Sequence, residues 1–455
     1  MITKDSIHKL SAAALLSAAA LVATTYSSCS SDDYAPNPVP DPIENEMATI
    51  NLSFSAPYID TRASYVDTEV NETIIKDLWV YFFKESNSGG NSVWTLAFAE
   101  DITLSNTSLT IDGNGQYNVG VGDNGFKTIM DGRIIAPGTY HVYVIANLEG
   151  YTSDDHEITK QNTDISPSAV TDRIDTSNPF TEAELKNYTF HTQSYANGDA
   201  SGVFTKYLPM AAQPSDLQVD FNPTDANSYN AQSGDLTISK GSVTIKATMT
   251  YLCSKVRYTF FFDNTPPSDN QEAGFSYPYS SMVYNAIGVH NAEAYSSLFG
   301  SEPTVPENED RYVEKNIIDD VDDPTQGCVR CDYPSDDDLK KWLDKDTDTG
   351  SMSLNYIKST ETSGKIAYQG IVYLPQNLAT ATDNKTYLHL KVCFDGSEKI
   401  TDYKIYLPNA ESATLDRGNF YDIVGKITSS GLSFKVRVKK WVKDPEGVIP
   451  MPLNL

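Results

Sequence analysis

The sequence predicts a mainly β protein with two β-sandwich domains in tandem, in a transthyretin-like or Greek-key arrangement. Runs of β-branched and aromatic residues recur along the 455-residue chain, and many of the 28 tyrosines lie in or beside them. Clusters of Asn, Gly, Asp and Pro separate these runs, as expected of turns. Helical patterns are few; the clearest is a capping box formed by Thr181 and Glu184 in "FTEAELKNY".

The strands are expected where apolar residues alternate with polar ones or form short continuous runs. These places are 48–56, 74–83, 93–99, 139–148, 236–262, 370–376, 385–394 and, as two strands joined by "TSSG", 419–442. No repeat of fixed period interrupts this order.

The first 28 residues are predicted to be a secretory signal peptide. Lys4 and Lys9 precede an apolar run over 10–23, which is too short to span a bilayer as a permanent helix. Cys29 follows a polar "TTYSS" and is the expected lipidation site of a lipoprotein. The alternative is an ordinary signal peptide with an incidental cysteine. No later hydrophobic run could span a membrane, so a lipid would be the only anchor.

Composition divides the mature chain into three parts. Residues 29–46 are rich in Pro and acidic residues and predict a disordered tether. A polar stretch over 222–235 lacks apolar periodicity and suggests a domain boundary. We therefore expect an N-terminal sandwich over 47–225 and a C-terminal sandwich over 226–455.

Charge excludes two classes of partner. The net charge of −27 repels nucleic acids and anionic membrane surfaces.

Of the cysteines beyond Cys29, Cys253 and Cys393 lie in apolar strands and are expected in the core. Cys328 and Cys331 form a lone C-x-x-C, for which a local disulfide or inert thiols are favoured over a zinc or redox site.

The sequence contains no recognisable catalytic motif. It lacks histidine pairs at ligand spacing, nucleophile elbows and phosphate-binding loops, so we expect neither an enzyme nor a cofactor. The one weak metal candidate is "DKDTDTG", in which Asp344, Asp346 and Asp348 have the spacing that begins a calcium loop. Gly350 comes one place late and Asn355 stands where a closing Glu is needed, so a solvated acidic loop is favoured.

The strands near the two ends of the chain raise the same question, namely where each of them pairs. Near the start, Ile50, Leu52 and Phe54 form the apolar face of a strand that is soon followed by Arg62-Ala63, a site open to a trypsin-like protease. Near the end, Leu432, Phe434, Val436 and Val438 alternate with polar residues, and Trp441 resumes the apolar content. From the residues alone, each strand would simply pair inside its own domain.

A family resemblance offers another interpretation. "MATINLSFSAPYIDTRAS" resembles the start of the Bacteroidales fimbrillin (type V pilin, major fimbrial subunit) family, in which a similar strand precedes an Arg-Ala processing site. Three further stretches are similar in order and spacing: "YLPMAAQP" at 207–214, "VTIKATMTYLCSKVRYTF" at 243–260 and "LDRGNFYDIVGKI" at 415–427, followed by a "VRVKKWV" strand. The resemblance is patchy but spans most of the mature chain.

The resemblance implies a lipoprotein precursor that a surface protease cuts after an arginine. Carried onto this chain, Cys29 is lipidated, the bond between Arg62 and Ala63 is cut, and the strand carrying Ile50, Leu52 and Phe54 leaves. The groove that it vacates is then filled by the C-terminal donor strand of another subunit, here Leu432, Phe434, Val436, Val438 and Trp441.

The leading hypothesis is therefore a structural subunit of a cell-surface fimbria that supports adhesion. Its partners would be other fimbrial subunits in a homopolymer or mixed fibre, a lipid anchor in the outer membrane, and a host or bacterial surface ligand. The alternatives are a fimbrial tip adhesin, an anchor subunit, or a stand-alone surface lipoprotein that binds glycan through its tyrosines and tryptophans.

Overall fold

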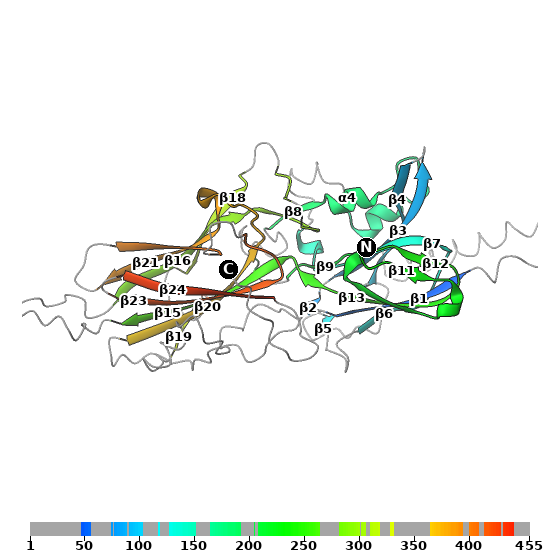
Figure 1. Cartoon of the computed structure of the whole chain (residues 1–455). Coiled ribbons are helices and arrows are strands. Elements are labelled where there is room, and N and C mark those ends of the chain that lie inside the picture. The colour runs from blue at the N-terminus through cyan, green and yellow to red at the C-terminus, as the bar shows by residue number, and fades with distance from the viewer. Residues whose placement is uncertain are drawn as a thin grey trace, which may run out of the picture. The chain divides into compact units, whose positions relative to one another are not determined.

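In the computed structural model (Figure 1), the residues whose structure is described lie between 47 and 440, in several separate ranges. These are 47–55, 74–75, 77–88, 91–102, 117–118, 127–151, 164–192, 204, 208–263, 282–300, 302–305, 310–318, 328–331, 365–394, 400–408, 414–428 and 431–440. In this part of the chain no helix is long and apolar enough to cross a membrane.

The N-terminal sandwich consists of two sheets. Sheet 1 has the order β10-β13-β1-β6, with β1 Ala48–Ser55, β6 Lys127–Ile135, β10 Leu217–Phe221 and β13 Gly241–Thr248. Sheet 2 has the order β11-β12-β7-β3-β4, and β9 pairs with both β7 and β14. Its strands are β3 Leu78–Ser88, β4 Asn91–Asp101, β7 Gly138–Ala146, β9 Met210–Ala212, β11 Ser228–Tyr229, β12 Leu236–Ile238 and β14 Thr250–Tyr251.

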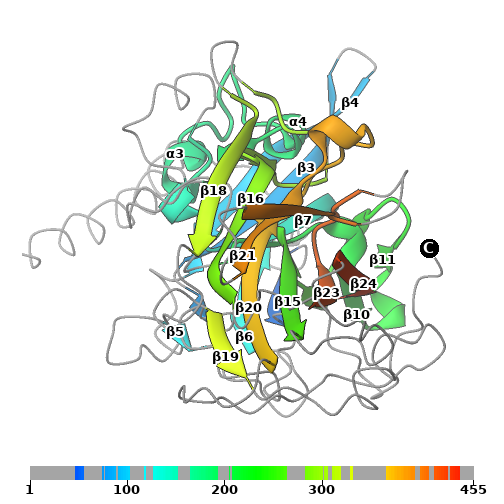
Figure 2. The same cartoon turned by 90° about the vertical axis from the view of Figure 1, so that its left-hand side faces the viewer.

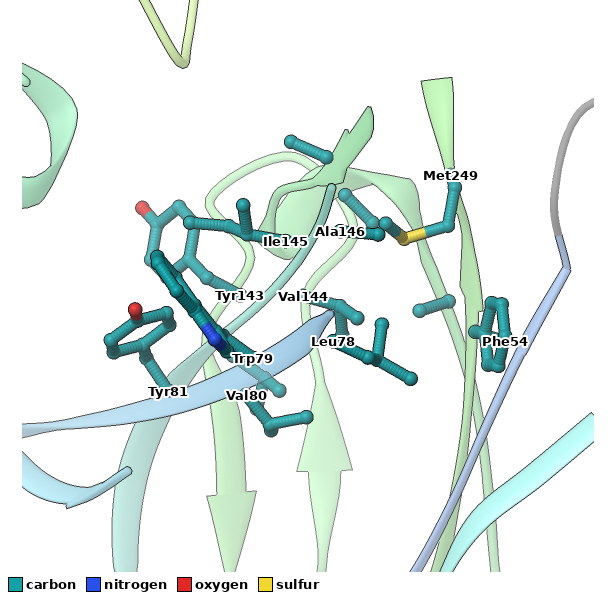
Figure 3. Close-up of a cluster of buried hydrophobic side chains, with 14 of the residues drawn as sticks. Phe54, Leu78, Trp79, Val80, Tyr81, Tyr143, Val144, Ile145, Ala146 and Met249 are labelled. Atoms are coloured by element: carbon teal, nitrogen blue, oxygen red, sulfur yellow. The ribbon is translucent and has the colours of Figure 1, made fainter. Parts of the chain in front are cut away.

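One hydrophobic core joins these two sheets. Apolar side chains of β1 and β13 pack together with those of β3 and β7 in a single cluster of buried residues. Figure 3 shows the ring of Phe54 directed into this core, on the side of Leu78 and Met249. Face-to-face packing of two sheets over such a core is the β-sandwich arrangement that the sequence predicted.

Two short helices lie against sheet 2, α3 Pro167–Thr171 and α4 Glu182–Lys186. The predicted capping box is confirmed: the Glu184 amide donates to the Thr181 hydroxyl oxygen, and the Glu184 carboxylate accepts from the Thr181 amide at 2.8 Å. Because both faces of sheet 2 are covered, the side chains of β3 are buried on both sides, including Trp79 and Val80. This explains why "LWVYFF" shows a continuous apolar run instead of alternation.

The C-terminal sandwich also has two sheets. Sheet 3 has the order β19-β20-β15-β23-β24 and sheet 4 has the order β18-β16-β21-β22. The strands of sheet 3 are β15 Cys253–Asp263, β19 Cys328–Cys331, β20 Lys365–Pro375, β23 Asn419–Thr428 and β24 Gly431–Lys440. Those of sheet 4 are β16 Met282–Glu293, β18 Tyr312–Ile318, β21 Tyr387–Phe394 and β22 Ile400–Tyr406. Buried residues of both sheets form the second core.

The remaining elements are small. Two-stranded sheets are formed by β8 Thr189–His191 with β17 Tyr295–Ser297, and by β2 Ile74–Ile75 with β5 Tyr117–Asn118. Short 3-10 turns are η1 Glu149–Tyr151, η4 Pro214–Asp216, η5 Pro223–Asp225 and η7 Thr382–Asn384.

The strands that follow the expected domain boundary at residue 225 pair with the N-terminal sheets. β12 lies against β7, and β13 lies between β10 and β1. The first strand of sheet 3 along the chain is β15, which begins at Cys253. The polar stretch at 222–235 is therefore a connection within the first sandwich. We propose that the two domains meet near Leu252 instead of at 225.

Candidate functional site

The first strand, β1, is a central strand of sheet 1. On one side it runs parallel to β13, with Leu52 opposite Ile245, and on the other it runs antiparallel to β6. Removing a central strand leaves two unpaired neighbours that face each other across a slot, whereas removing an edge strand exposes only one. We call this position between β13 and β6 the β1 slot.

Four side chains of β1 point into the core. Ala48, Leu52 and Phe54 have no exposed area, and Ile50 retains 1%. This is the alternating face predicted from the sequence. At about 1.5–3 kcal/mol for each of the three larger side chains, their burial contributes roughly 5–9 kcal/mol. An empty slot would return that apolar surface to water.

A polar contact fixes the register of β1 against β6. The pairing shifts between Ile50 and Leu52, so that the neighbouring strand bulges opposite Asn51. Gly132 lies in this bulge with φ +65°, a left-handed conformation that favours glycine. Its amide donates to the Asn51 side-chain oxygen at 2.7 Å. Asn51 thus supplies the acceptor that the interrupted ladder does not.

The outer face of β1 is polar and makes only long contacts with β13. The hydroxyl groups of Thr49 and Ser53 donate to carbonyl oxygens of that strand at 3.5 and 3.4 Å. The end of the strand is held more closely, because the Met249 amide donates to the Ser55 carbonyl at 2.9 Å. Apart from Asn51, specificity for β1 therefore resides mainly in its buried face and its backbone.

The last described strand, β24, occupies a different position. Among the described strands it lies at the edge of sheet 3 and pairs with β23, in an antiparallel ladder that matches Thr428 with Gly431. Its four alternating apolar side chains, Leu432, Phe434, Val436 and Val438, are partly buried and pack against the second core. β24 therefore has the same number and spacing of apolar side chains as β1 but is less completely buried.

The structure does not bring β1 and β24 together. Each pairs within its own sandwich, which is the arrangement that the residues alone suggested.

The other predicted site residues lie outside the described residues: the lipidation site Cys29, the cleavage site Arg62-Ala63, the donor residue Trp441 and the weak calcium candidate Asp344, Asp346 and Asp348. Among the residues that are described, no group of three or more His, Cys, Asp or Glu side chains is placed to hold a metal ion.

Buried titratable groups near α4 form a structural brace. His141 Nδ1 lies 2.6 Å from Glu182 Oε1, and its Nε2 lies 2.9 Å from Asp235 Oδ1. Burial would raise the pKa of Glu182, but hydrogen bonds from His141, Tyr143 and Lys186 outweigh this and lower it to about 2. The imidazole is held at both nitrogens and the carboxylate by three donors, so neither is available for proton transfer to a substrate.

Sequence reasoning missed two features of the β1 slot. It did not identify β13 as the parallel neighbour of β1, and it did not find the bulge at Gly132. The apolar alternation over 243–247 and the lone glycine between Asp131 and Arg133 were the available signals.

The fold and the slot define a tandem β-sandwich protein in which the first described strand lies inside a sheet and the last described strand lies at the edge of the described part of its sheet. Residues 48–249, which end just after β13, match the family model described as "Major fimbrial subunit protein (FimA)". This matched part of the chain is similar to a family of fimbrial structural proteins, as the resemblance had suggested. Fimbriae are cell-surface structures, and a fimbrial protein has other fimbrial subunits as partners.

Solved structures show weaker similarity. A protein from Bacteroides eggerthii described as a candidate cell adhesion protein has 13% identity and a TM-score of 0.42, covering 88% of this chain and 97% of its own. The tip fimbrial protein Mfa3 of Porphyromonas gingivalis has 11% identity and a TM-score of 0.37, covering 87% and 100%. The fimbrial anchor protein Mfa2 of the same species has 8% identity and a TM-score of 0.31, covering 87% and 99%. No curated protein sequence matches the chain.

Proposed function

We propose that this protein is a structural subunit of a cell-surface fimbria that polymerises by donor-strand exchange and supports adhesion. It is exported as an outer-membrane lipoprotein through Cys29 and cut after Arg62. β1 then leaves its slot, and the donor strand of another subunit takes its place. The observation that carries the proposal is the contrast between β1, which is internal and has its apolar face fully buried, and β24, which lies at the edge of sheet 3 and whose apolar face is partly buried.

The slot suits strand exchange because it offers both backbone and side-chain binding. An incoming strand pairs with β13 on one side and β6 on the other, and it fills the positions left by Ile50, Leu52 and Phe54. A strand in the slot forms two hydrogen-bonded ladders and buries its apolar face, so it is held more firmly than a strand that pairs with a single neighbour at the edge of a sheet. A subunit bound in this way dissociates slowly.

β24 suits the role of donor because leaving its own sheet costs comparatively little. In the described part of the chain it has one ladder to break, and its apolar side chains are only partly buried. Moving into another subunit's slot would complete their burial. Because the donor β24 belongs to sheet 3 and the slot to sheet 1, the contact joins two different surfaces of successive subunits, and such a head-to-tail contact produces a filament when it does not close into a ring.

Cleavage after Arg62 would make the loss of β1 irreversible. While β1 is covalently attached, its high effective concentration returns it to the slot faster than another chain can enter. Once the connection is cut, the released strand dilutes away. The proposal therefore predicts that the uncut precursor stays monomeric.

A reversible lock on β1 tests this proposal. Thr49 and Ser242 face each other in the parallel register, and neither is buried, so the double variant T49C/S242C can form a disulfide across the slot. After limited trypsin digestion we expect the oxidised protein to stay monomeric and to polymerise once dithiothreitol is added. Wild-type protein should polymerise in both conditions, and the single variant T49C is the matched control.

Two outcomes would contradict the proposal. Polymers of the oxidised double variant would show that β1 need not leave, and the absence of wild-type polymers would contradict the proposal that the protein polymerises by strand exchange.

Two deletions test the donor: loss of residues 432–455 should abolish polymers, whereas loss of 443–455 should leave them. N-terminal sequencing of sheared surface protein should give Ala63 as the first residue.

A further inference from the structure

The β1 slot and the strand proposed to enter it do not match residue for residue. β1 directs one small side chain, Ala48, and three large ones into the core, and each of the four has at most 1% exposed area. β24, which lies beside β23 on the side away from β15 (Figure 2), is different. It carries four large apolar side chains at the same spacing: Leu432, Phe434, Val436 and Val438. Such a strand can fill three large places in more than one direction and register.

The place of Ala48 limits how the donor strand is accommodated. Ala48 has no exposed area and lies between Gly241 on β13 and Ile135 on β6. If all four large side chains entered the slot, Leu432 or Val438 would stand where Ala48 does. Added carbon atoms in a well-packed core force the surrounding side chains and backbone to shift. The donor is therefore better placed one inward position further along the slot.

Two registers then fill the places of Ile50, Leu52 and Phe54. In the parallel register the donor runs in the same direction as β1, and Leu432 takes the place of Ile50. In the antiparallel register the donor runs the opposite way, and Val438 takes that place. Because inward side chains recur at every second residue of a strand, no other register fills all three places and spares the small one.

The residue that falls at the place of Ala48 differs between the two registers. It is Ser430 in the parallel register and Lys440 in the antiparallel one, since each stands two positions beyond the apolar set. A serine is close to alanine in size. A lysine at a place without exposed area would bring a buried charge that lacks a partner. This end of the slot therefore favours the parallel direction.

The contact made by Asn51 separates the same two registers. Its side-chain oxygen accepts from the Gly132 amide at 2.7 Å. The donor residue at this place is Ser433 in the parallel register and Arg437 in the antiparallel one. A serine hydroxyl group can accept a hydrogen bond, whereas an arginine side chain can only donate and would face the amide with a second donor. Within residues 431–440, Ser433 has the only side chain that can act as an acceptor.

The parallel register also conserves the volume of the buried face. It puts Leu, Phe and Val into the places of Ile50, Leu52 and Phe54, so the buried set loses a single carbon atom. The antiparallel register supplies Val, Val and Phe and loses two. Cores tolerate several hydrophobic exchanges at once when the total volume and the pattern are kept.

One donor residue stands at the same place in both registers. Lys435 replaces Ser53, opposite Lys246 on β13. The Nζ atom of Lys246 lies 3.1 Å from Oδ2 of Asp220, which offsets its charge, and any remaining cost is shared by the two registers. The direction is therefore decided at the places of Ala48 and Asn51.

We propose that the slot takes the β24 strand of another copy of this chain in the parallel register, with Leu432 in the place of Ile50 and Ser433 in the place of Asn51. This inference rests on the proposed function and adds to it the identity, direction and register of the strand that enters.

Cysteine cross-linking in the polymer reads the register directly. Thr244 lies opposite Asn51 on β13, so the donor residue at the place of Asn51 comes next to Thr244 of the subunit that it enters. After limited trypsin digestion and oxidation, polymers of T244C/S433C should be joined by disulfides and run as a ladder on a non-reducing gel after boiling. Polymers of T244C/R437C, T244C/K435C and the single variant T244C should run as monomers.

The contrary results distinguish this inference from the proposed function. Disulfide ladders in T244C/R437C would show an antiparallel donor, and ladders in T244C/K435C would show that all four large side chains enter the slot. In both cases polymers form, so strand exchange stands and the parallel register is wrong. If wild-type protein forms no polymers, both proposals are wrong.

Alanine variants of the donor test the direction without cysteines. Leu432 and Val438 are both partly buried against the second core, so V438A is the matched control for the weakening of β24 in its own sheet. In the parallel register only Leu432 fills a large place of the slot. Polymers of L432A should therefore dissociate in urea at least about tenfold faster than wild-type polymers, and those of V438A less than about threefold faster. Equal effects of the two variants, or a larger effect of V438A, would overturn the proposal.

Discussion

Substitution of Leu52 by Ala offers a direct measure of how firmly β1 is held in its slot. The side chain is fully buried, opposite Ile245 on one side and Met130 on the other. Removing a buried leucine side chain to the β-carbon costs about 2–5 kcal/mol, of which part is lost transfer free energy and part is the cavity left behind. If β1 opens as a unit, this cost falls entirely on the closed state, because the opened strand has already lost these contacts.

The expected result is a large rise in the opening of β1. At 1.4 kcal/mol for each factor of ten, the substitution should raise the open population by roughly 30- to 4,000-fold. Hydrogen exchange read by mass spectrometry over residues 48–55 measures this population, and release of the N-terminal fragment after trypsin cleavage should become faster in the same order. V436A on β24 is the matched control and should leave exchange in β1 unchanged.

The same measurement can refute the reasoning. If L52A leaves protection of residues 48–55 as in wild type while global stability falls, β1 does not open alone but only when the whole first sandwich unfolds. The slot would then be an inseparable part of the fold, and strand exchange could not proceed through it.

Three further predictions concern single contacts. N51A removes the acceptor of the Gly132 amide and should cost about 1 kcal/mol, read as faster exchange in β1, while N51D keeps the acceptor and should have little effect. Burial raises the pKa of Asp77 from 3.8 to about 7, so the folded state binds this proton more tightly than the unfolded state and wild-type stability falls as pH rises from about 4 to above 7. D77N should remove this fall, a relative gain of up to about 4 kcal/mol at pH 8 and none at pH 4, as measured by urea unfolding. T181A breaks the capping box with Glu184 and should cost about 1 kcal/mol, detectable as faster exchange over α4.

Each of these predictions has a clear contrary result. Equal exchange in N51A and N51D would show that the amide finds another acceptor. Parallel pH profiles for wild type and D77N would mean that the carboxyl group titrates alike in the folded and unfolded chains. Unchanged protection of α4 in T181A would show that packing alone holds that helix.

Local patterns were enough to predict the strands whose two faces differ. The alternation of Ile50, Leu52 and Phe54 predicted β1 within one residue, and the turn at "TSSG" correctly separated β23 from β24. The capping box at Thr181 needed only residues three apart. In all these cases the determining information lies within a few positions along the chain.

Pairing between distant segments could not be predicted in this way. Nothing near residues 241–248 indicates that this strand lies beside β1, almost 200 residues earlier. β6 escaped notice because its bulge breaks the alternation that would have identified it. Contacts of this kind follow from topology, which a single sequence specifies only through the whole fold.

The continuity of the chain from β13 into β15 has a mechanical consequence. β13 is one wall of the slot that receives a strand, and β15 lies in the middle of the sheet whose edge is β24, with only residues 249–252 between the two strands. In a fibre of the proposed kind, tension would enter a subunit at the slot and leave it through its donor strand. That tension would be transmitted along an almost unbroken extended backbone, so that the ladders on either side are loaded along their length and their hydrogen bonds resist together. A pilus built from such units would stretch little before its subunits unfold.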